Sequence, residues 1–245
     1  MQLDLSTRHG RLKASFPDPA GFMRLPEFVL NLFPLEERLV SMGVKAALDG
    51  GRKISCRAGC GACCRQPVPV SLPEAFLLYE MLAGQPEEKK KIVLSRFEAA
   101  RERLQEHGFA DRSLQSDAET GAVVGLALDY FKLNIPCPFL EAESCSIHTH
   151  RPMSCREHLV TSPADLCKIP DHPEIRGIDA SVSLTQSFAL LYAVLAQEPP
   201  MILPLPLALE YASERIEMRT RRYESKSLFT AFFSILENLL PSKPG

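Results

Sequence analysis

The stretch ISCRAGCGACCRQ, residues 54–66, places Cys56, Cys60, Cys63 and Cys64 within nine residues and separates them with arginine, alanine and glycine. The two glycines give the backbone the freedom that a tight turn requires. Cysteine thiolates are preferred ligands of zinc and of iron-sulfur clusters. The stretch therefore predicts a metal-binding loop, and we expect the fold to be organised around it.

A second segment of the chain is also rich in metal ligands. The other four cysteines all fall in it, at Cys137, Cys145, Cys155 and Cys167. His148, His150 and His158 lie among them as further candidate ligands, although a histidine is more often an ordinary surface or core residue. We predict the eight cysteines, as a group, to be metal ligands.

The number of thiols exceeds what one metal site needs. A single closed site takes four ligands, so eight thiols permit two sites, or leave one or two cysteines outside the coordination. The adjacent residues Cys63 and Cys64 cannot easily point at one metal. The sequence leaves both arrangements open.

Four arginines lie on or near the cysteines: Arg57, Arg65, Arg151 and Arg156. Bound thiolates add negative charge, which guanidinium groups offset. Arg151 and Arg156 bracket Cys155, and we predict that they bind an anionic cofactor or ligand, such as a carboxylate or a phosphate, beside the metal. Ordinary surface exposure is the alternative interpretation of each arginine.

Composition excludes several classes of protein. The 245 residues carry a formal net charge of −2 and a predicted pI near 6.3, which gives no basic field for binding nucleic acid. No segment reaches the roughly 18 apolar residues of a membrane span, and the first residues lack the apolar run of a signal peptide. We therefore predict a cytoplasmic protein without nucleic-acid or membrane partners. Thiols are kept reduced in the cytoplasm, so metal ligands or reactive groups are expected rather than disulfides.

The flanking sequence predicts a mainly α fold: a helical domain with irregular cysteine-rich metal-binding loops and a small N-terminal β-hairpin. We expect one domain over residues 1–245, with the hairpin in 1–21, the metal-binding core in 52–170 and a helical region in 178–240. Six prolines between residues 136 and 173 exclude long helices and central strands there. That segment therefore needs an external support, and we expect it to meet the first cysteine segment at one shared metal site.

Apolar periodicity, capping residues and stop signals predict the individual helices. They lie between Pro34 and Gly50, between Ser71 and Gly84, between Pro86 and Gly108, between Ser116 and Asn134, and around residues 184–195, 207–216 and 228–239. Ser71 with Glu74, and Ser116 with Glu119, form candidate capping boxes.

The helix after Pro86 is predicted to be amphipathic. Its buried face is expected to hold Ile92, Phe97, Ala100 and Leu104, and the charged run at residues 87–91 is expected to be a solvated face.

The cysteine motifs resemble those of a known family. The run C-x3-C-x2-C-C from Cys56 to Cys64 is followed by CPFL from Cys137 and by CSIHTHRPMSCRE from Cys145. In this order they resemble the motifs of the CxxCxxCC zinc- or iron-chelating proteins, also called the YkgJ-like cysteine-cluster family. The first gap is one residue longer here than in the family's label, and His148 stands where the family commonly has tyrosine.

The resemblance covers residues 56 to about 167 and implies that these cysteines bind zinc, iron or an iron-sulfur cluster. Through its cysteine motif the family also resembles flagellin lysine methylases that are thought to use an iron-sulfur cluster, which makes an enzymatic role conceivable. Cys56, Cys60 and Cys63 share the C-x3-C-x2-C spacing of radical S-adenosylmethionine enzymes too. Those enzymes alternate strands and helices, however, whereas the segments after Cys64 are predicted to be helical.

Three functions remain open at this point. The first is a protein that binds an iron-sulfur cluster or iron, with a redox or methyl-transfer-like catalytic role. The second is a zinc-stapled structural or interaction module without catalysis. The third is a metal chaperone or sensor. The expected partner is another protein or a small anionic ligand, and the sequence does not decide whether the chain is an enzyme.

Overall fold

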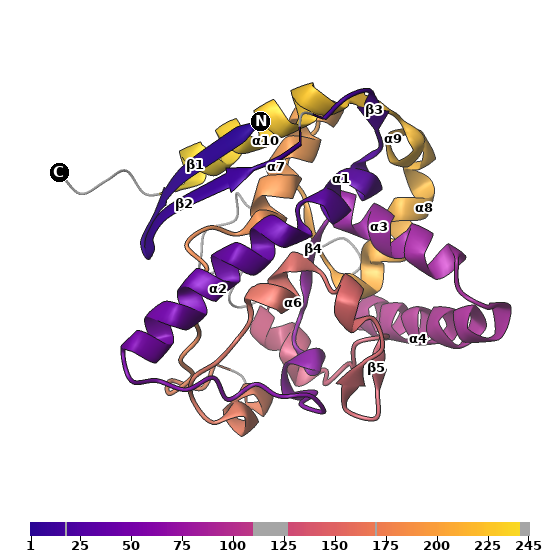
Figure 1. Ribbon diagram of the computed structural model, residues 1–245. Coiled ribbons are helices and arrows are strands. Elements are labelled where there is room, and N and C mark those ends of the chain that lie inside the picture. The colour runs from indigo at the N-terminus through magenta and orange to yellow at the C-terminus, as the bar shows by residue number, and fades with distance from the viewer. Residues whose placement is uncertain (18, 110–126, 170, 241–245) are drawn as a thin grey trace.

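Helices form most of the fold, as predicted, in a computed structural model that describes residues 1–17, 19–109, 127–169 and 171–240 (Figure 1). The predicted N-terminal hairpin is also confirmed, since β1 (Gln2–Thr7) pairs antiparallel with β2 (Gly10–Ser15). The hairpin lies beside α10 (Ser225–Leu239), and Phe16 at its end stacks at 5.4 Å from Phe229 of that helix. None of the described helices is both long enough and apolar enough to cross a membrane.

Most of the predicted helices are present. They are α2 (Phe33–Asp49), α3 (Leu72–Ala83), α4 (Glu87–Glu106), α7 (Leu184–Ala196) and α10. The helix predicted around residues 207–216 is divided instead, because the backbone leaves the helical region at Arg215. It forms α8 (Ala208–Glu214), after a 3-10 turn at Leu205–Leu207, and a separate α9 (Ile216–Thr220).

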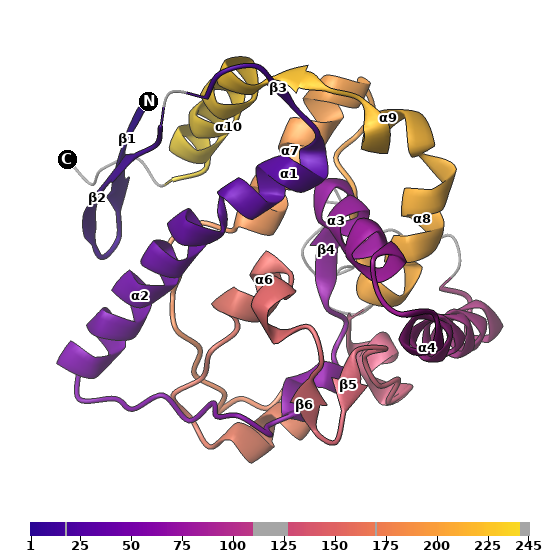
Figure 2. The same ribbon diagram turned by 45° about the vertical axis from the view of Figure 1, so that its right-hand side comes forward.

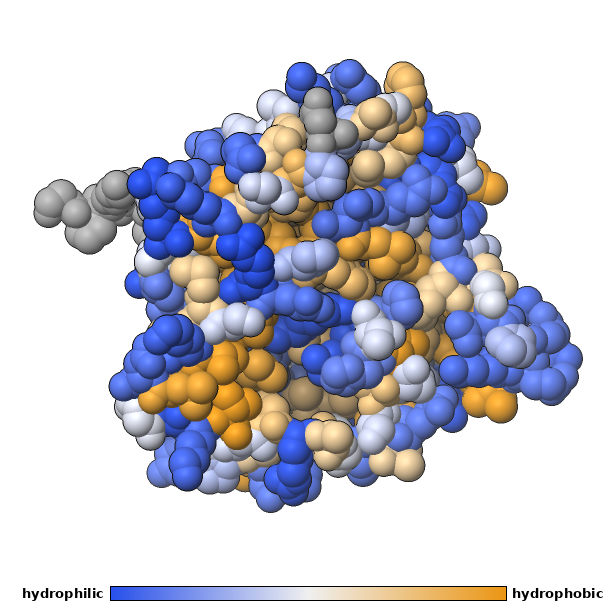
Figure 3. Space-filling model, in the orientation of Figure 1, coloured by the Kyte–Doolittle hydropathy of each residue, from blue (hydrophilic) through white to orange (hydrophobic). Residues whose placement is uncertain are grey.

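The predicted buried face of α4 is wrong at one position. Ile92 is 51% exposed, and Val93 packs in its place with Phe97, Ala100 and Leu104. Because each residue turns a helix by about 100°, the five residues from Ile92 to Phe97 leave the two side chains about 140° apart. The charged side of α4 projects into solvent as predicted, and it forms the blue ridge on the right of Figure 3.

The helix predicted between Ser116 and Asn134 can be followed only at its end. Residues 127–132 are helical, and Asn134 follows them with a positive φ of 50°, as a helix terminator does. The start of this helix and its capping box, Ser116 with Glu119, lie outside the described residues.

Several short elements were not predicted. Three small antiparallel pairs join distant segments: β3 (Phe22–Met23) with β8 (Tyr223–Glu224), β4 (Pro69–Ser71) with β7 (Ile202–Pro204), and β5 (Leu140–Glu141) with β6 (Ser144–Cys145). The helices α1 (Leu25–Asn31) and α6 (Met153–Glu157) are also short. The β4–β7 pair matters for the site, because it ties the exit of the first cysteine segment to the C-terminal helical region.

The main core draws on both ends of the chain. Phe28 of α1 makes edge-to-face contacts with Phe188 of α7 and with Phe229 and Phe232 of α10, at centroid distances of 6.1, 5.0 and 5.4 Å. Helix α1 therefore holds α7 and α10 together, although it has only seven residues.

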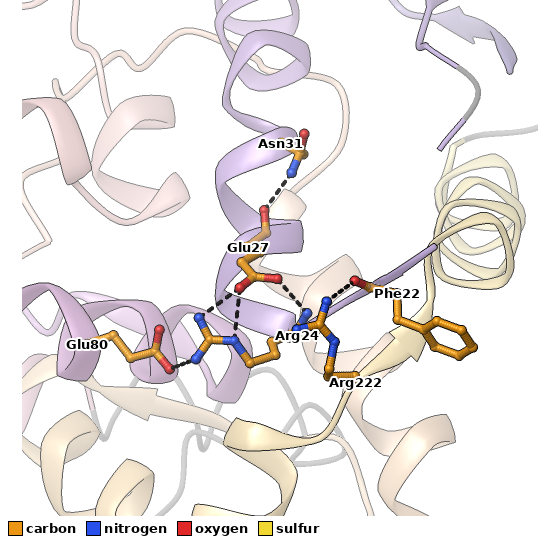
Figure 4. Close-up of polar contacts among 6 residues, drawn as sticks. All are labelled: Phe22, Arg24, Glu27, Asn31, Glu80 and Arg222. Carbon is orange, nitrogen blue, oxygen red and sulfur yellow. Dashed lines mark hydrogen bonds and ion pairs between the residues drawn. The ribbon is translucent and has the colours of Figure 1, made fainter. Parts of the chain in front are cut away.

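The start of α1 is fixed by a charged network (Figure 4). The backbone N–H of Arg24 donates to Oε2 of Glu27, and its guanidinium donates to Oε1 of Glu27 and to Oε1 of Glu80 in α3, the latter at 2.6 Å. Arg222 donates to the carbonyl of Phe22 and so joins the segment after α9 to the strand before α1.

A buried carboxylate connects α3, α6 and α7. Glu74, only 2% exposed, confirms the predicted capping box, because its Oε2 accepts from both the N–H and the hydroxyl of Ser71. Its Oε1 accepts from the backbone N–H of Met153 at 2.8 Å and from the hydroxyl of Thr185 at 3.3 Å. The sequence predicts the capping contact but not the two contacts to α6 and α7.

Replacing Glu74 is expected to destabilise the protein strongly. In Glu74→Ala, buried donors of three residues lose their acceptor, and we expect a loss of about 3 kcal/mol in the free energy of unfolding, measured by urea denaturation. Glu102→Ala, on the exposed side of α4, is the control and should change it by less than about 0.5 kcal/mol. Equal effects of the two variants would contradict this role for Glu74.

Candidate metal centre

The two cysteine segments lie side by side, as predicted, although a helical stretch separates them in sequence. The backbone N–H of Cys137 donates to the carbonyl of Cys64 at 2.7 Å, and that of Ser55 donates to the carbonyl of Val160 at 2.9 Å. Gln66 donates to the carbonyl of Cys167 at 3.0 Å. Figures 1 and 2 both show residues 52–66 passing along the lower edge of the molecule beside the later segment.

The glycine at position 61 allows the close approach of the two segments. A Cβ atom on Gly61 would lie 2.6 Å from the carboxylate of Glu143 and 2.9 Å from the side chain of Leu140. Arg65 closes the same contact, since it donates to the carbonyl of Gly61 and pairs with Glu143 at 2.6 Å. Arg65 therefore has a structural partner at the edge of the site.

All eight cysteines are free thiols, and three of them pack together on one side of the site. We call Cys56, Cys60 and Cys167 the first thiol group. They surround Ala62 and Val160 in a small apolar cluster, and the backbone N–H of Val160 donates to Sγ of Cys56 at 3.3 Å. The group joins the first cysteine segment to the last cysteine of the second.

Four other thiols form the second thiol group: Cys64, Cys137, Cys145 and Cys155. Burial raises the pKa of Cys137 to about 12, with Cys145 and Cys63 adding to the shift. Burial also raises the pKa of Cys155, again with a contribution from Cys137. The backbone N–H groups of Phe139 and Ile147 donate to Cys137 and Cys145 and act in the opposite direction. These thiols therefore share one electrostatic environment.

Cys63 lies within electrostatic range of both groups. It raises the pKa of Cys56 and Cys167 in the first group and of Cys137, Cys145 and Cys155 in the second. Its own pKa is lowered to about 7, because the neighbouring Cys64 thiol donates a hydrogen bond to it and because Arg151 is close. Cys63 therefore ionises more readily than its neighbour Cys64, whose pKa the same hydrogen bond raises.

The donor set fits a soft metal, although the side chains are not yet arranged around one. Free thiols that gather in a part-buried site are suitable ligands for zinc, iron and iron-sulfur clusters. Within the described residues, no group of three or more His, Cys, Asp or Glu side chains already has the geometry to hold a metal ion. A shared metal site between the two segments, and the ligand role of each cysteine, stay predictions.

The two arginines predicted to hold an anion differ in their surroundings. Arg151 lowers the pKa of Cys56, Cys63, Cys145 and Cys155, and its Nε is buried without a hydrogen-bond partner among the described residues.

Arg156 is engaged elsewhere. It donates to the carbonyls of Arg151 and Thr149 at 3.1 and 2.5 Å, and it stacks over the ring of Phe33 at 3.9 Å. Arg151 is therefore the cation that faces the thiols, and anion binding by either arginine stays a prediction.

The three histidines lie at the edge of the second segment. His148 is exposed, and the nearby Arg151 lowers its pKa. His150 is exposed and shares a 3.0 Å hydrogen bond with the hydroxyl of Thr149, and His158 is exposed as well. In the part of the chain that the structure describes, none of the three makes a hydrogen bond to a cysteine, and ligation by them stays a prediction.

Comparison with known proteins places this site in a family. Residues 55–172 match the family model CxxCxxCC, described as "Putative zinc- or iron-chelating domain". This part of the chain is therefore similar to the CxxCxxCC family. No curated protein and no solved structure gives a significant match to the chain. The match confirms the resemblance that the cysteine motifs carry and supports metal chelation, with the choice between zinc and iron left open.

Two carboxyl groups with raised pKa values near the second cysteine segment were missed by the sequence analysis. Glu36 of α2 is fully buried, and neither of its oxygens accepts a hydrogen bond from a described residue. Burial, Glu157 and Glu74 raise its pKa to about 9, against the opposing effect of Arg156. The only sequence signal is position, since Glu36 falls three residues before Leu39 on the buried face of α2.

The second missed group, Glu157, follows Cys155 within the CxxCxxCC domain. Burial raises its pKa to about 7, although its Oε1 accepts from the backbone N–H of Leu184 at the start of α7. Glu157, at the end of α6, lies within electrostatic range of Glu36, as does Glu74, so three carboxyl groups gather there. At neutral pH this cluster retains at least one proton in the folded protein.

Glu36 predicts a pH dependence of stability. A carboxyl whose pKa rises from 4.5 to about 9 on folding retains its proton, so its favourable contribution is complete at low pH and is lost as the pH rises between these values. Glu36→Gln removes this dependence. We expect the variant to be more stable than the native protein by about 2 kcal/mol at pH 8 and by much less at pH 5, measured by urea denaturation.

The neighbouring residue provides the control for this prediction. Glu37 is on the same turn, and its side chain is 70% exposed. Glu37→Gln should change the free energy of unfolding by less than about 0.5 kcal/mol at both pH values. If Glu36→Gln has the same effect at pH 5 and pH 8, the raised pKa is refuted.

Proposed function

We propose that this protein binds iron through its thiolates, as an iron-sulfur cluster or as iron ions, and uses the bound metal in redox chemistry. The proposal is carried by the gathering of eight free thiols from two distant segments around Cys63 and Arg151. In this proposal, Cys63 joins the first thiol group as its fourth ligand. The second thiol group already has four thiols. Four thiolates suffice for one zinc ion or one cluster.

The arrangement gives the adjacent pair Cys63 and Cys64 separate roles. The hydrogen bond with Cys63 and burial raise the pKa of Cys64, and Cys137 and Cys155 of the second group add to the shift. Cys63 also raises the pKa of Cys56 and Cys167, and we therefore assign Cys63 to the first group. With one member of the pair in each group, neither site needs both side chains to point at the same metal. Both groups then link the first cysteine segment to the second.

Other residues of the chain support iron-sulfur chemistry. Backbone N–H groups that donate to cluster thiolates favour the more negative, reduced state, and Phe139 and Ile147 supply two of them. Arg151 offsets the negative charge of the thiolates and has an Nε without a partner among the described residues. A bound cluster would supply electron transfer. In a methyl-transfer-like reaction, Arg151 would hold an anionic group of the reacting molecule beside the cluster.

A zinc-stapled module without catalysis is the second candidate. It is favoured by the scarcity of regular structure in the second cysteine segment, where β5 and β6 have two residues each and α6 has five. Coordination by four thiolates would stabilise such a segment without any chemistry.

Anaerobic purification of the full chain followed by metal analysis and visible spectroscopy distinguishes the two candidates. An iron-sulfur cluster gives a brown protein with broad visible absorbance that bleaches on reduction with dithionite. Zinc gives a colourless protein with up to two zinc ions per chain. Stoichiometric zinc and no iron in protein from iron-supplemented cells would replace the first candidate by the second.

Cysteine variants test the proposed division into two groups. Cys167→Ser should remove the metal of the first group and Cys145→Ser that of the second, so each should lower the metal content by about half, because a closed site needs all four of its ligands. The measurement is metal content per chain on folded, monodisperse protein. The control, Ser144→Ala, alters the exposed neighbour of Cys145 and should leave the content unchanged.

The alternatives give different results. Complete loss of metal in either single variant would show one shared site. Full retention in either variant would show that the altered cysteine is not a ligand.

A further inference from the structure

A cavity of about 220 Å³ lies beside the metal centre, between the end of α3, helix α4 and the second cysteine segment. Its apolar wall includes Leu82, Val93, Phe139 and Ile147, all of them buried. Lys89, Thr149 and His150, which are exposed, line it as well. The cavity therefore combines buried apolar side chains with polar groups that reach solvent.

The lining of the cavity favours an anion. It includes Lys89 and His150 but no aspartate or glutamate among the described residues. The next two lysines of α4 are already paired, Lys90 with Glu87 at 2.5 Å and Lys91 with Glu88 at 3.6 Å. Lys89 forms no ion pair with any residue that the structure describes. Its ammonium group is thus available to a negative ligand at the cavity.

We propose that this cavity binds a small monocarboxylate with a short apolar chain. The chain lies against Phe139, Ile147 and Val93, and the carboxylate binds the ammonium group of Lys89, with Thr149 and His150 as further hydrogen-bond partners. One unpaired lysine matches a single negative charge. The cavity is smaller than the roughly 300 to 1,000 Å³ of drug-sized sites, which limits the ligand to a short chain.

The cavity adjoins the cysteine centre through two of its wall residues. The backbone N–H groups of Phe139 and Ile147 donate to the thiols of Cys137 and Cys145, while the residues themselves line the cavity. A ligand in the cavity would therefore lie behind the second thiol group without touching a thiol. The binding site is independent of the proposed metal and of its identity.

Hexanoate is a suitable probe, and its binding can be followed by ¹H–¹⁵N NMR on the full chain in its diamagnetic form, zinc-loaded or metal-free and reduced. We expect saturable shifts at Val93, Phe139 and Ile147, with a dissociation constant in the millimolar range. Hexylammonium, which has the same chain and the opposite charge, should bind at least tenfold more weakly. Shifts confined to residues 56–64 would mean binding at the metal or thiols and would overturn the proposal.

Two variants of α4 test the role of charge. Lys89→Glu should weaken hexanoate binding at least tenfold, whereas Lys91→Glu, the matched control outside the cavity, should leave it within twofold. Thr149→Trp should also weaken binding, by filling the cavity, and its thermal unfolding shows whether it is folded. Absence of saturable binding, equal binding of hexylammonium, or an unaltered affinity in Lys89→Glu would each refute the proposal.

Discussion

The position of the cysteine centre depends on the buried carboxylate of Glu74. Burying a carboxyl group is unfavourable unless hydrogen bonds replace its water, and Glu74 receives them from Ser71, Met153 and Thr185. These residues begin α3, α6 and α7, so one side chain fixes the starts of three helices. Burial raises the pKa of Glu74 and the bonds from Ser71 and Met153 lower it. Since α6 carries Cys155, this balance also fixes one wall of the second thiol group.

The cysteine thiols of the centre differ in how readily they lose their protons. Burial raises the pKa of Cys137, of Cys155 and of Cys167, the last to about 11, so these thiols are protonated in the absence of a metal. Under the proposed function, metal binding would have to release those protons, and Arg151 would favour the release because it stabilises nearby thiolates. The hydrogen bond from Cys64 lowers the pKa of Cys63, so Cys63 ionises more readily than these three thiols.

Much of the fold was predictable from local signals, and the rest depends on contacts that no local signal carries. Glycines, prolines and the capping box at Ser71 mark where α2, α3, α4 and α7 end or begin. The sequence analysis assigned Ile92 instead of Val93 to the buried face of α4, because both residues are apolar and only packing distinguishes them. Cysteine spacing indicated the centre and its chemistry. It did not indicate which thiols pack together, nor that Glu36 would be buried, because both follow from long-range packing. The organisation of residues 1–245 as a single domain stays a prediction.

The two thiol groups differ in what the rest of the chain provides for them. The second group rests on the main core, to which Phe139, Ile147 and Met153 belong. Among the described residues, the first group packs with a small cluster that contains Ala62, Val160 and Ile175, which is too little apolar surface to offset the entropy of ordering the surrounding loops. If both groups bind metal as proposed, coordination energy would be needed for folding mainly at the first group. At the second group the packed frame exists already, so folding would not depend on a metal there. The two proposed functions, stapling and catalysis, would then be compatible in one protein, each at a different set of thiols.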